Sequence, residues 1–459
     1  MLNYIWLAFL LIAVLVGGFT GRLPQLTTGA FDTAKIAVMN IALPLIGVMA
    51  IWLGIMRLAE RSGFVQLLAR ALRPLMVRLF PDVPAEHPAM GAMLMNMAAN
   101  MLGLGNAATP LGLRAMSLLE KLNPRPGVAS NAMCTFLAIN TASIQLIPTT
   151  AIGLLAVAKS TNPTAIVPSA FLATLCAAVS GVTAAKLLER LPMFRLPPAT
   201  AVAAVAAVVA SEGAAQDSTE ELAIEKIEIT PMTPMKTIAL ALFIVAFAVM
   251  FVFLAFPQWL SGFMTVPPRP ADLEGKPDII RSLFAVSILA VPFLLSFFPL
   301  YATLRGVKVY EQFVEGAKEA FGVGMRIVPF LVAMLVAISM LKEAGVIALM
   351  TQALTPILNA IRFPADLLPM VLMRPLSGSA TQGLFVELIS RTGDGFGPDS
   401  LISRMAATIY GSTETTFYVI AVYFGSVAVR QTRHAIAAGL IADTVAVIAS
   451  IAICRLLFG

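Results

Sequence analysis

The chain has 459 residues, of which 59% are hydrophobic and only 12% are charged, about half the charged fraction of an ordinary soluble domain. Several apolar runs reach about 20 residues, enough to cross a hydrocarbon core of about 30 Å. The composition therefore excludes an ordinary soluble protein and predicts an all-α integral membrane protein that crosses the bilayer several times.

The charge and the reactive side chains narrow the class further. The net charge is +6, but no basic patch with interleaved aromatic residues occurs, so we expect no nucleic-acid partner. Cys134, Cys176 and Cys454 lie within apolar segments without metal or disulfide spacing, and His87 and His434 stand alone. We therefore expect no bound metal and no other cofactor.

The first half of the chain, residues 1–195, contains apolar spans separated by polar breaks. The segment 64–80 has arginines opposite an apolar face, which suits a helix lying on an anionic membrane surface. The segment 88–112 combines glycines and a proline with polar residues, which predicts a re-entrant hairpin. The elements expected in this half are helices at 4–21 and 35–57, the amphipathic helix at 64–80, the hairpin at 88–112, and spans at 130–158 and 165–188.

The middle of the chain separates this half from a second one. Residues 196–235 carry acidic side chains among small residues and prolines, which predicts a flexible, water-exposed linker. An apolar run at 236–260 predicts one linking transmembrane helix. The second half, 280–459, then repeats the earlier order: helices at 282–301 and 319–341, an amphipathic helix at 346–361, a hairpin at 366–390, and spans at 403–428 and 435–457.

Short sequence matches relate the two halves. LAERSGF (58–64) parallels LKEAGVI (341–347), LFPDVP (79–84) parallels RFPADL (362–367), and AATPLGL (107–113) parallels SATQGLF (379–385). With four spans in each half and one linking helix between them, the second half is inverted relative to the first. Lysines and arginines then collect on one side, as expected for the cytoplasmic side. We therefore predict two inverted-topology repeats joined by an extra helix.

Polar residues in the broken segments of the first half mark a candidate solute site. Broken backbone at membrane depth is tolerated where it is buried in protein or lines a watery cavity, and broken segments at matching positions of inverted repeats indicate a transporter's binding site. The alternative is that amide side chains only hold packed helices together. The residues predicted to bind solute are Asn96, Asn100, Asn106, Thr109, Asn140, Thr141 and Gln145.

The second half carries charged groups at the matching positions. The planar fork of Arg374 suits a carboxylate or phosphate; the alternatives are snorkelling to the interface and a fixed internal ion pair, for which Glu414 is a candidate partner. The residues predicted to bind solute here are Arg374, Ser377, Ser379, Thr381, Gln382, Ser412 and Thr413. The residues predicted to couple transport to H⁺ or Na⁺ are the intramembrane acids Glu414 and Asp443.

The same segments resemble a known family. FPDVPAEHPAMGAMLMNMAANMLGLGNAATPLGLRAM (80–116) resembles spore maturation protein A, and RPLSGSATQGLFVEL (374–388) resembles spore maturation protein B, as does the sequence from 411 to 443. Both belong to the nucleoside-recognition, or Gate, group of membrane proteins. The resemblance implies a bacterial inner-membrane protein with inverted repeats and re-entrant hairpins. The fusion of both proteins through an added helix departs from the usual pattern.

These observations lead to one favoured function and two alternatives. The favoured function is secondary transport of a small polar or anionic metabolite, such as a nucleoside, an amino acid or a carboxylate, across the lipid bilayer. The alternatives are a non-transporting scaffold for envelope or spore maturation and a membrane-embedded enzyme. No familiar catalytic motif supports an enzyme. Assembly into a homo-oligomer is compatible with either non-enzymatic function.

Overall fold

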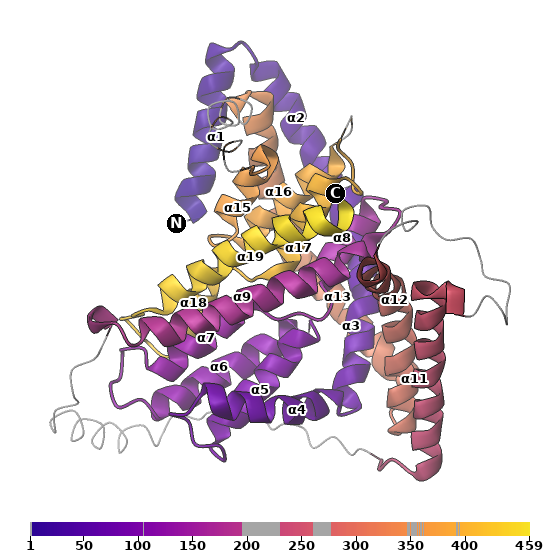
Figure 1. The fold of residues 1–459 in the computed structure, drawn as a ribbon. Helices are drawn as coiled ribbons and strands as arrows, with labels where there is room; N and C mark the ends of the chain where they lie inside the picture. The colour runs from indigo at the N-terminus through magenta and orange to yellow at the C-terminus, as the bar shows by residue number, and fades with distance from the viewer. Residues whose placement is uncertain are drawn as a thin grey trace.

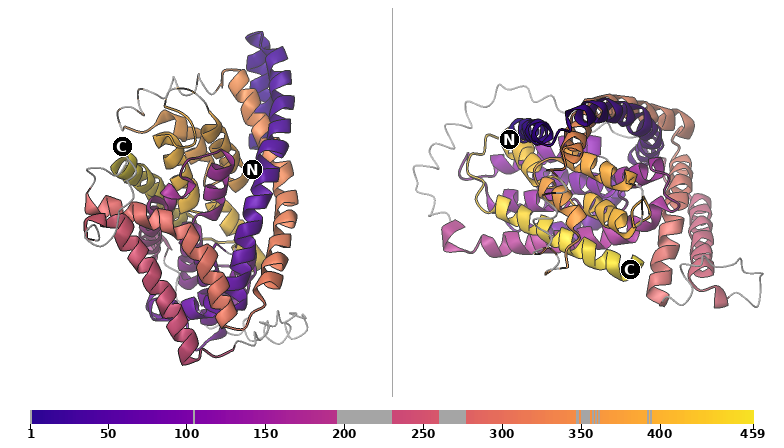
Figure 2. Two further views of the ribbon diagram at one scale, coloured as in Figure 1. Left: turned by 90° about the vertical axis from the view of Figure 1, so that its right-hand side faces the viewer. Right: turned by 90° about the horizontal axis from the view of Figure 1, so that it is seen from above.

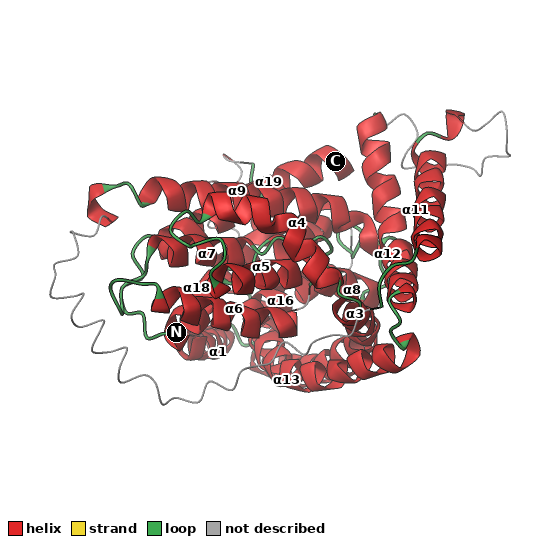
Figure 3. Cartoon of the chain, turned by 90° about the horizontal axis from the view of Figure 1, so that it is seen from below, coloured by secondary structure: helices red, strands yellow, loops and turns green. Residues whose placement is uncertain are grey.

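The computed structural model describes residues 2–103, 105–194, 230–259, 277–346 and 362–459 apart from positions 392 and 394, together with four isolated residues between 349 and 360. These ranges contain helices, loops and one isolated bridge between Val128 and Gln431, but no strand, as Figure 3 shows. The all-helical prediction is confirmed. The acidic linker and the amphipathic helix predicted at 346–361 fall largely outside the described residues.

Six helical stretches in the described ranges are long and apolar enough to cross a membrane. They are Leu23–Arg61, Pro163–Leu188, Pro234–Ala255, Asp278–Leu304, Val309–Glu343 and Ala435–Phe458. A shorter apolar helix, Trp6–Phe19, precedes them. Multi-pass membrane insertion is therefore a property of the fold, including the linking helix α11 (Pro234–Ala255) that the sequence predicted.

The first long stretch begins earlier than the predicted helix at 35–57. Helix α2 (Leu23–Ile36), a π-helical segment (Ala37–Ala42) and α3 (Leu43–Arg61) follow one another without a break. Because of polar residues near the start of this stretch, the predicted helix begins too late. Thr27 and Thr28 donate their hydroxyls to backbone carbonyls one turn earlier, so these side chains are accommodated within the helix.

Helix α13 (Val309–Glu343), likewise longer than the predicted 319–341, packs along α2 and α3, and Figure 2 shows these tall helices together. Thr33 donates a hydrogen bond of 2.9 Å to Ser339, whereas Gly54 faces the Phe313 ring near the other end of both helices. The two helices therefore run antiparallel. Gly316 allows the close approach, because a Cβ there would lie 2.6 Å from the Leu53 carbonyl oxygen.

Helices α9 (Ile166–Leu188) and α19 (Ala435–Phe458) form a second cross-half pair and lie side by side in Figure 1. Ala177 packs with Ala446, and Ala184 packs with Ala438. This pair is also antiparallel, because one residue number rises as the other falls. Small side chains let the two backbones approach closely, as is common between membrane helices.

The remaining helices surround these two pairs. Helices α1 (Leu2–Phe19) and α12 (Asp278–Leu304) flank the α3–α13 pair, and α11 lies against α12. Helix α4 (Phe64–Leu79) buries Val65, Ala69 and Met76 against its neighbours and leaves Leu67 and Leu75 exposed. It forms as predicted for 64–80 and packs on α5 (Pro88–Met101).

Four of the predicted segments are interrupted helices. The hairpin at 88–112 consists of α5 and α6 (Gly105–Lys121), and the hairpin at 366–390 consists of α15 (Leu368–Met373) and α16 (Gly378–Ser390). The segments 130–158 and 403–428 were predicted as continuous spans, which is wrong. The first divides into α7 (Asn131–Ala142) and α8 (Thr149–Val157), and the second into α17 (Leu401–Ser412) and α18 (Thr416–Ser426).

A methyl group at Gly316 tests the close α3–α13 contact. We expect Gly316→Ala to lower the free energy of unfolding by about 1–3 kcal/mol, because the added carbon meets backbone atoms that cannot rotate away. Gly322→Ala in the same helix is the control, since nothing lies within 4 Å of its Cβ position; it should be neutral or stabilising by up to about 1 kcal/mol. Thermal unfolding in detergent measures both, and equal effects would contradict the contact.

Candidate functional site

The two hairpins place their tips against the two helix breaks. In the first hairpin, Asn96 donates a hydrogen bond of 2.7 Å to the Ala108 carbonyl, which ties α5 to α6. The Met101 carbonyl at the tip accepts a bond from Leu146 N, between α7 and α8. The side chain of Asn106 lies outside the described part of the chain. Hairpin one is therefore anchored to the first break.

The second hairpin is built in the same way. Ser377 caps α16 by accepting a bond from Ala380 N, and its carbonyl accepts the Thr381 hydroxyl. Near the tip, the Pro375 carbonyl accepts a bond of 3.0 Å from Phe417 N at the start of α18. Hairpin two is therefore anchored beside the second break, between α17 and α18.

Each break exposes backbone groups that find partners within the protein. In the first, the Thr174 hydroxyl donates to the carbonyls of Ala142 (2.8 Å) and Ser143 (3.2 Å). The two breaks also meet each other, because Glu414 N donates a bond of 2.7 Å to the Thr141 carbonyl. Glu414 therefore lies at a break in the centre of the molecule, rather than within a continuous span.

Arg374 closes the second break. Its side chain is only 4% exposed. It donates to the Tyr410 carbonyl (2.9 Å) and to the Thr413 hydroxyl (3.3 Å), and its guanidinium lies 5.1 Å from the centre of the Tyr410 ring. Within the described residues no ion pair joins it to Glu414. Arg374 is therefore a buried partner of α17, and it does not snorkel to the membrane surface.

Asp443 is the second acid of this centre and is also buried. Its Oδ2 accepts a bond of 2.6 Å from the Thr416 hydroxyl at the start of α18. Thr413, which accepts the bond from Arg374, lies beside the same carboxylate, and Arg374 and Glu414 are both within electrostatic reach of it. Hydroxyl groups thus connect the guanidinium of one element to the acid of another.

A small polar cavity lies on one side of the breaks; we call it the Glu414 cavity. It encloses about 120 Å³. Asn100 donates a bond of 3.0 Å to Asn140 Oδ1, which also accepts the Tyr423 hydroxyl (3.3 Å). The lining residues are Asn100, Thr109, Asn140, Glu414, Tyr418, Val419, Val422 and Tyr423.

A larger cavity of about 240 Å³ lies between the hairpin tips and the α3–α13 pair; we call it the Gln382 cavity. Gln382 is 6% exposed, and its Nε2 has no hydrogen-bond partner among the described residues. Tyr410, Thr149, Thr150 and Gly103 contribute from the breaks and hairpin one. Apolar side chains such as Trp52 line the opposite wall.

The structure separates the predicted site residues into three groups. Asn100, Thr109, Asn140 and Glu414 share one cavity, and Gln382 lines the other. Arg374, Thr413 and Asp443 form the buried polar centre. The remaining predicted residues make local contacts. Asn96, Ser377 and Thr381 form hydrogen bonds within their hairpins, and the Thr141 carbonyl accepts the bond from Glu414 N. The Gln145 and Ser412 side chains bond within their own segments, and Ser379 is half-buried at the start of α16.

Sequence reasoning missed several lining residues. Tyr423 closes the Glu414 cavity, and Thr149 and Thr150 line the other one. Gly112 is the one signal that relates to Tyr423, because a Cβ there would lie 2.5 Å from the Tyr423 hydroxyl. A glycine close to a proline indicates a helix break. The sequence therefore did not reveal that Gly112 leaves room for the Tyr423 side chain.

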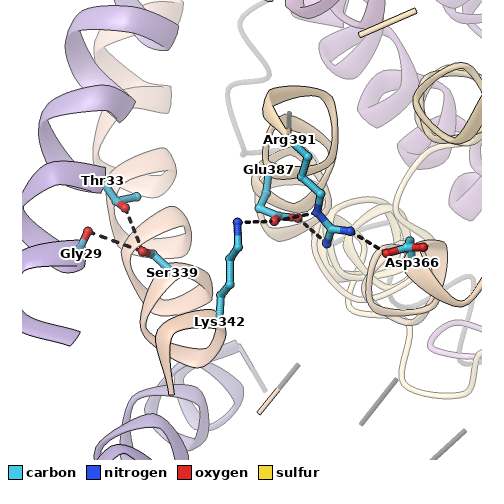
Figure 4. Close-up of polar contacts among 7 residues, drawn as sticks. All are labelled: Gly29, Thr33, Ser339, Lys342, Asp366, Glu387 and Arg391. Carbon is cyan, nitrogen blue, oxygen red and sulfur yellow. Dashed lines mark hydrogen bonds and ion pairs between the residues drawn. The ribbon is translucent and has the colours of Figure 1, made fainter. Parts of the chain in front are cut away.

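Ionic contacts hold hairpin two against α13 at one end of the molecule (Figure 4). Lys342 reaches Glu387 of α16 (3.3 Å), and Arg391 bonds both Glu387 oxygens and Asp366. Figure 4 also shows Thr33 and Gly29 meeting Ser339 across the α2–α13 contact. These contacts connect both arms of hairpin two to one another and to the long helix.

Asp399 links two loops at the ends of helices. Its carboxylate accepts bonds from the Ser160 hydroxyl (2.6 Å) and from the Thr161 amide and hydroxyl (2.8 Å each). Partial burial opposes ionisation, but these bonds outweigh it and lower the pKa of Asp399. At the matching loops, Ala129 N donates to the Gln431 carbonyl (2.9 Å). The loop before α17 is thus attached to the loop before α9, and the loop before α7 is attached to the loop before α19.

The comparisons with known proteins agree with this architecture. The Gate family, described as nucleoside recognition, matches residues 42–158 and 325–430, which include both hairpins and both breaks. Spore maturation protein A of Bacillus subtilis (strain 168) is 43% identical over 182 residues, covering 40% of this chain and 92% of its own length. Spore maturation protein B of the same strain is 42% identical over 174 residues, covering 38% and 96%. No solved structure matches.

Fold and comparisons together define the class: an all-helical, multi-pass membrane protein with the Gate, or nucleoside-recognition, domain in two segments. The chain belongs to the family of the spore maturation proteins A and B. Each relative matches about two fifths of the chain over nearly its whole length, as expected for a fusion of an A-like with a B-like protein.

Removing the buried guanidinium tests the polar centre. We expect Arg374→Gln to lower the free energy of unfolding by about 3–5 kcal/mol, because Asp443 and the Tyr410 carbonyl lose their cation. In the double variant Arg374→Gln with Asp443→Asn, part of that loss should be recovered. Chemical unfolding in detergent measures the cycle. Strictly additive effects of the two substitutions would show that the two side chains do not interact.

Proposed function

We propose that this protein is a secondary transporter of a small polar solute in a bacterial cytoplasmic membrane. The observation that carries the proposal is the convergence of four interrupted segments, two from each half, on a buried polar centre flanked by two cavities. Backbone freed at helix breaks has to be hydrogen-bonded inside the protein, and such breaks in membrane proteins accompany binding sites. Purely structural helix packing does not require cavities there.

Inverted repeats are part of this proposal. Both pairs of corresponding long helices, α3 with α13 and α9 with α19, run antiparallel. Inversion of one half relative to the other requires this direction. Ser130 and Ser400 each cap their broken helix by accepting a bond of 3.2 Å from the amide three residues later. The re-entrant path of the two hairpins belongs to the same proposal.

The two cavities also occupy corresponding places in the two halves. Counted from the capping serines, Asn140 of the Glu414 cavity matches Tyr410 of the Gln382 cavity, and each lies on the helix before its break. In inverted halves, matching cavities open toward opposite membrane surfaces, so a solute passing from one to the other crosses the membrane.

The halves differ in how the hairpins contact the long helices. In hairpin two, a Cβ on Gly383 would lie 3.5 Å from the Met334 Cβ of α13. The matching residue of hairpin one is Leu111, and its neighbour Gly112 faces Tyr423 of α18 instead. Because the repeats differ in this way, the protein has a second state. In that state hairpin one makes the contacts that hairpin two makes here, and hairpin two makes those of hairpin one. Counted from Phe31 and Phe313, Trp52 is the counterpart of Met334.

Disulfide trapping tests the exchange between states. In a background with the three native cysteines replaced by alanine, Met334→Cys with Gly383→Cys should cross-link readily, because the two Cβ atoms are within disulfide range. Trp52→Cys with Leu111→Cys should cross-link in a second population and compete with the first pair. Gel mobility after mild oxidation measures both. Failure of the second pair under all solute conditions would remove the exchange from the proposal.

Coupling is tested by flux into liposomes, using a panel of nucleosides, amino acids, dipeptides and dicarboxylates. For any solute that moves, we expect Glu414→Gln to reduce uptake about 100-fold or more, as for other removed positioned charges, and to abolish the dependence on pH or Na⁺. Asp443→Asn should impair coupling as well. Uptake that stays unchanged across pH in Glu414→Gln would show that this acid has no coupling role.

A second function, a scaffold in spore or envelope maturation, has one observation in its favour: the names of the relatives. A scaffold would not need its cavities, so substitutions that fill the Gln382 cavity discriminate between the two. Gly153→Leu, which projects toward Leu45 and Val48, should stop transport. A scaffold would keep its cellular role in this variant, provided that the variant protein still folds.

A further inference from the structure

The polar centre contains two acidic side chains and one basic side chain. Its charged side chains in the described residues are Arg374, Asp443 and Glu414, and both Arg374 and Glu414 lie within electrostatic reach of Asp443. Arg374 reaches Asp443 through Thr413. One guanidinium therefore faces two carboxylates, and Glu414 is left without a cation. An unpaired charge inside a membrane protein is costly unless something compensates it.

Glu414 is placed where a ligand can supply that cation. Its side chain is half-buried on the wall of the Glu414 cavity, and in the described part of the chain it takes part in no ion pair. The cavity volume of about 120 Å³ is far above the ~10–15 Å³ that one water requires. A proton would need no such space.

The other walls suit a positive ligand as well. Asn140 Oδ1 already accepts bonds from Asn100 and from the Tyr423 hydroxyl, so of these two amide oxygens that of Asn100 is the one with no donor among the described residues. Tyr418 and Tyr423 bring aromatic rings, whose faces attract cations. Lysine and arginine are absent from the recorded lining of both cavities, and Arg374 is engaged with α17. An anionic solute finds no free cation there.

We propose that the Glu414 cavity binds a cation, either an alkali metal ion or a primary ammonium group, held by the Glu414 carboxylate beside the Asn100 amide and the tyrosine rings. This refines the proposed transport function, because it replaces an anionic solute by a neutral one that is co-transported with the ion or by a cationic one. Arg374 is then a fixed internal charge of the site, and it does not contact the solute.

Thermal unfolding of the purified full chain tests this proposal without knowledge of the solute. At constant ionic strength set with choline chloride, NaCl, KCl and LiCl form one arm, and methylammonium and ethylammonium chloride form the other. We expect one arm to raise the melting temperature by about 2–4 °C at saturation. The response should be lost in Glu414→Gln and kept in Glu311→Gln, an exposed acid at the start of α13.

The two arms and one further measurement decide the outcome. Without added cation, Glu414→Gln should melt higher than the native chain, because the uncompensated charge is gone. If the salts raise the melting temperature of Glu414→Gln as much as that of the native chain, the proposed cation site is wrong. Stabilisation by falling pH alone, with no effect of either salt series, also overturns it, in favour of a proton. Liposome flux is separate: cation binding without any solute flux would reject transport and leave this site intact.

Discussion

The requirement to satisfy backbone groups at buried helix breaks governs this fold. Each carbonyl or amide that is freed in the protein interior costs several kcal/mol unless the protein supplies a partner. Thr174 does so for the end of α7, and Arg374 does so for the end of α17. The bond between Glu414 N and the Thr141 carbonyl joins the two breaks directly. The hairpin tips, the cavities and the buried charges are arranged around these contacts.

The sequence predicted the broad architecture because hydrophobic length and glycine content are strong signals in membrane proteins. The linking helix, α4, α9 and α19 appear close to their expected ranges. The breaks at 143–148 and 413–415 were not predicted, since an apolar run containing threonines is compatible with a continuous helix. The Thr174 hydroxyl that makes the first break tolerable is distant in sequence, so no local pattern announces it.

Side-chain pairing was harder to predict than segment order. Arg374 and Glu414 were expected to be possible partners, yet Arg374 bonds Tyr410 and Thr413 while Glu414 faces a cavity. One residue along an extended segment reverses the direction of a side chain, and Thr413 and Glu414 are adjacent in such a segment. Which of them faces the guanidinium depends on a backbone conformation that the sequence pattern does not encode. Asn100, Asn140 and Glu414 were each predicted as site residues, but the tyrosines that line the same cavity were not.

The antiparallel pairing of the long helices has an electrostatic consequence. Each α-helix carries a macrodipole equivalent to about half an elementary charge at either end, and in the pairs α3–α13 and α9–α19 opposed directions cancel much of it. At the centre the half-length helices α7 and α17 end with their carbonyl side, and α8 and α18 begin there with their amide side. Each break therefore brings a negative and a positive helix end together, so the helix dipoles largely cancel there as well. The charge of the centre is then set by its side chains, Arg374, Asp443 and Glu414, rather than by the backbone.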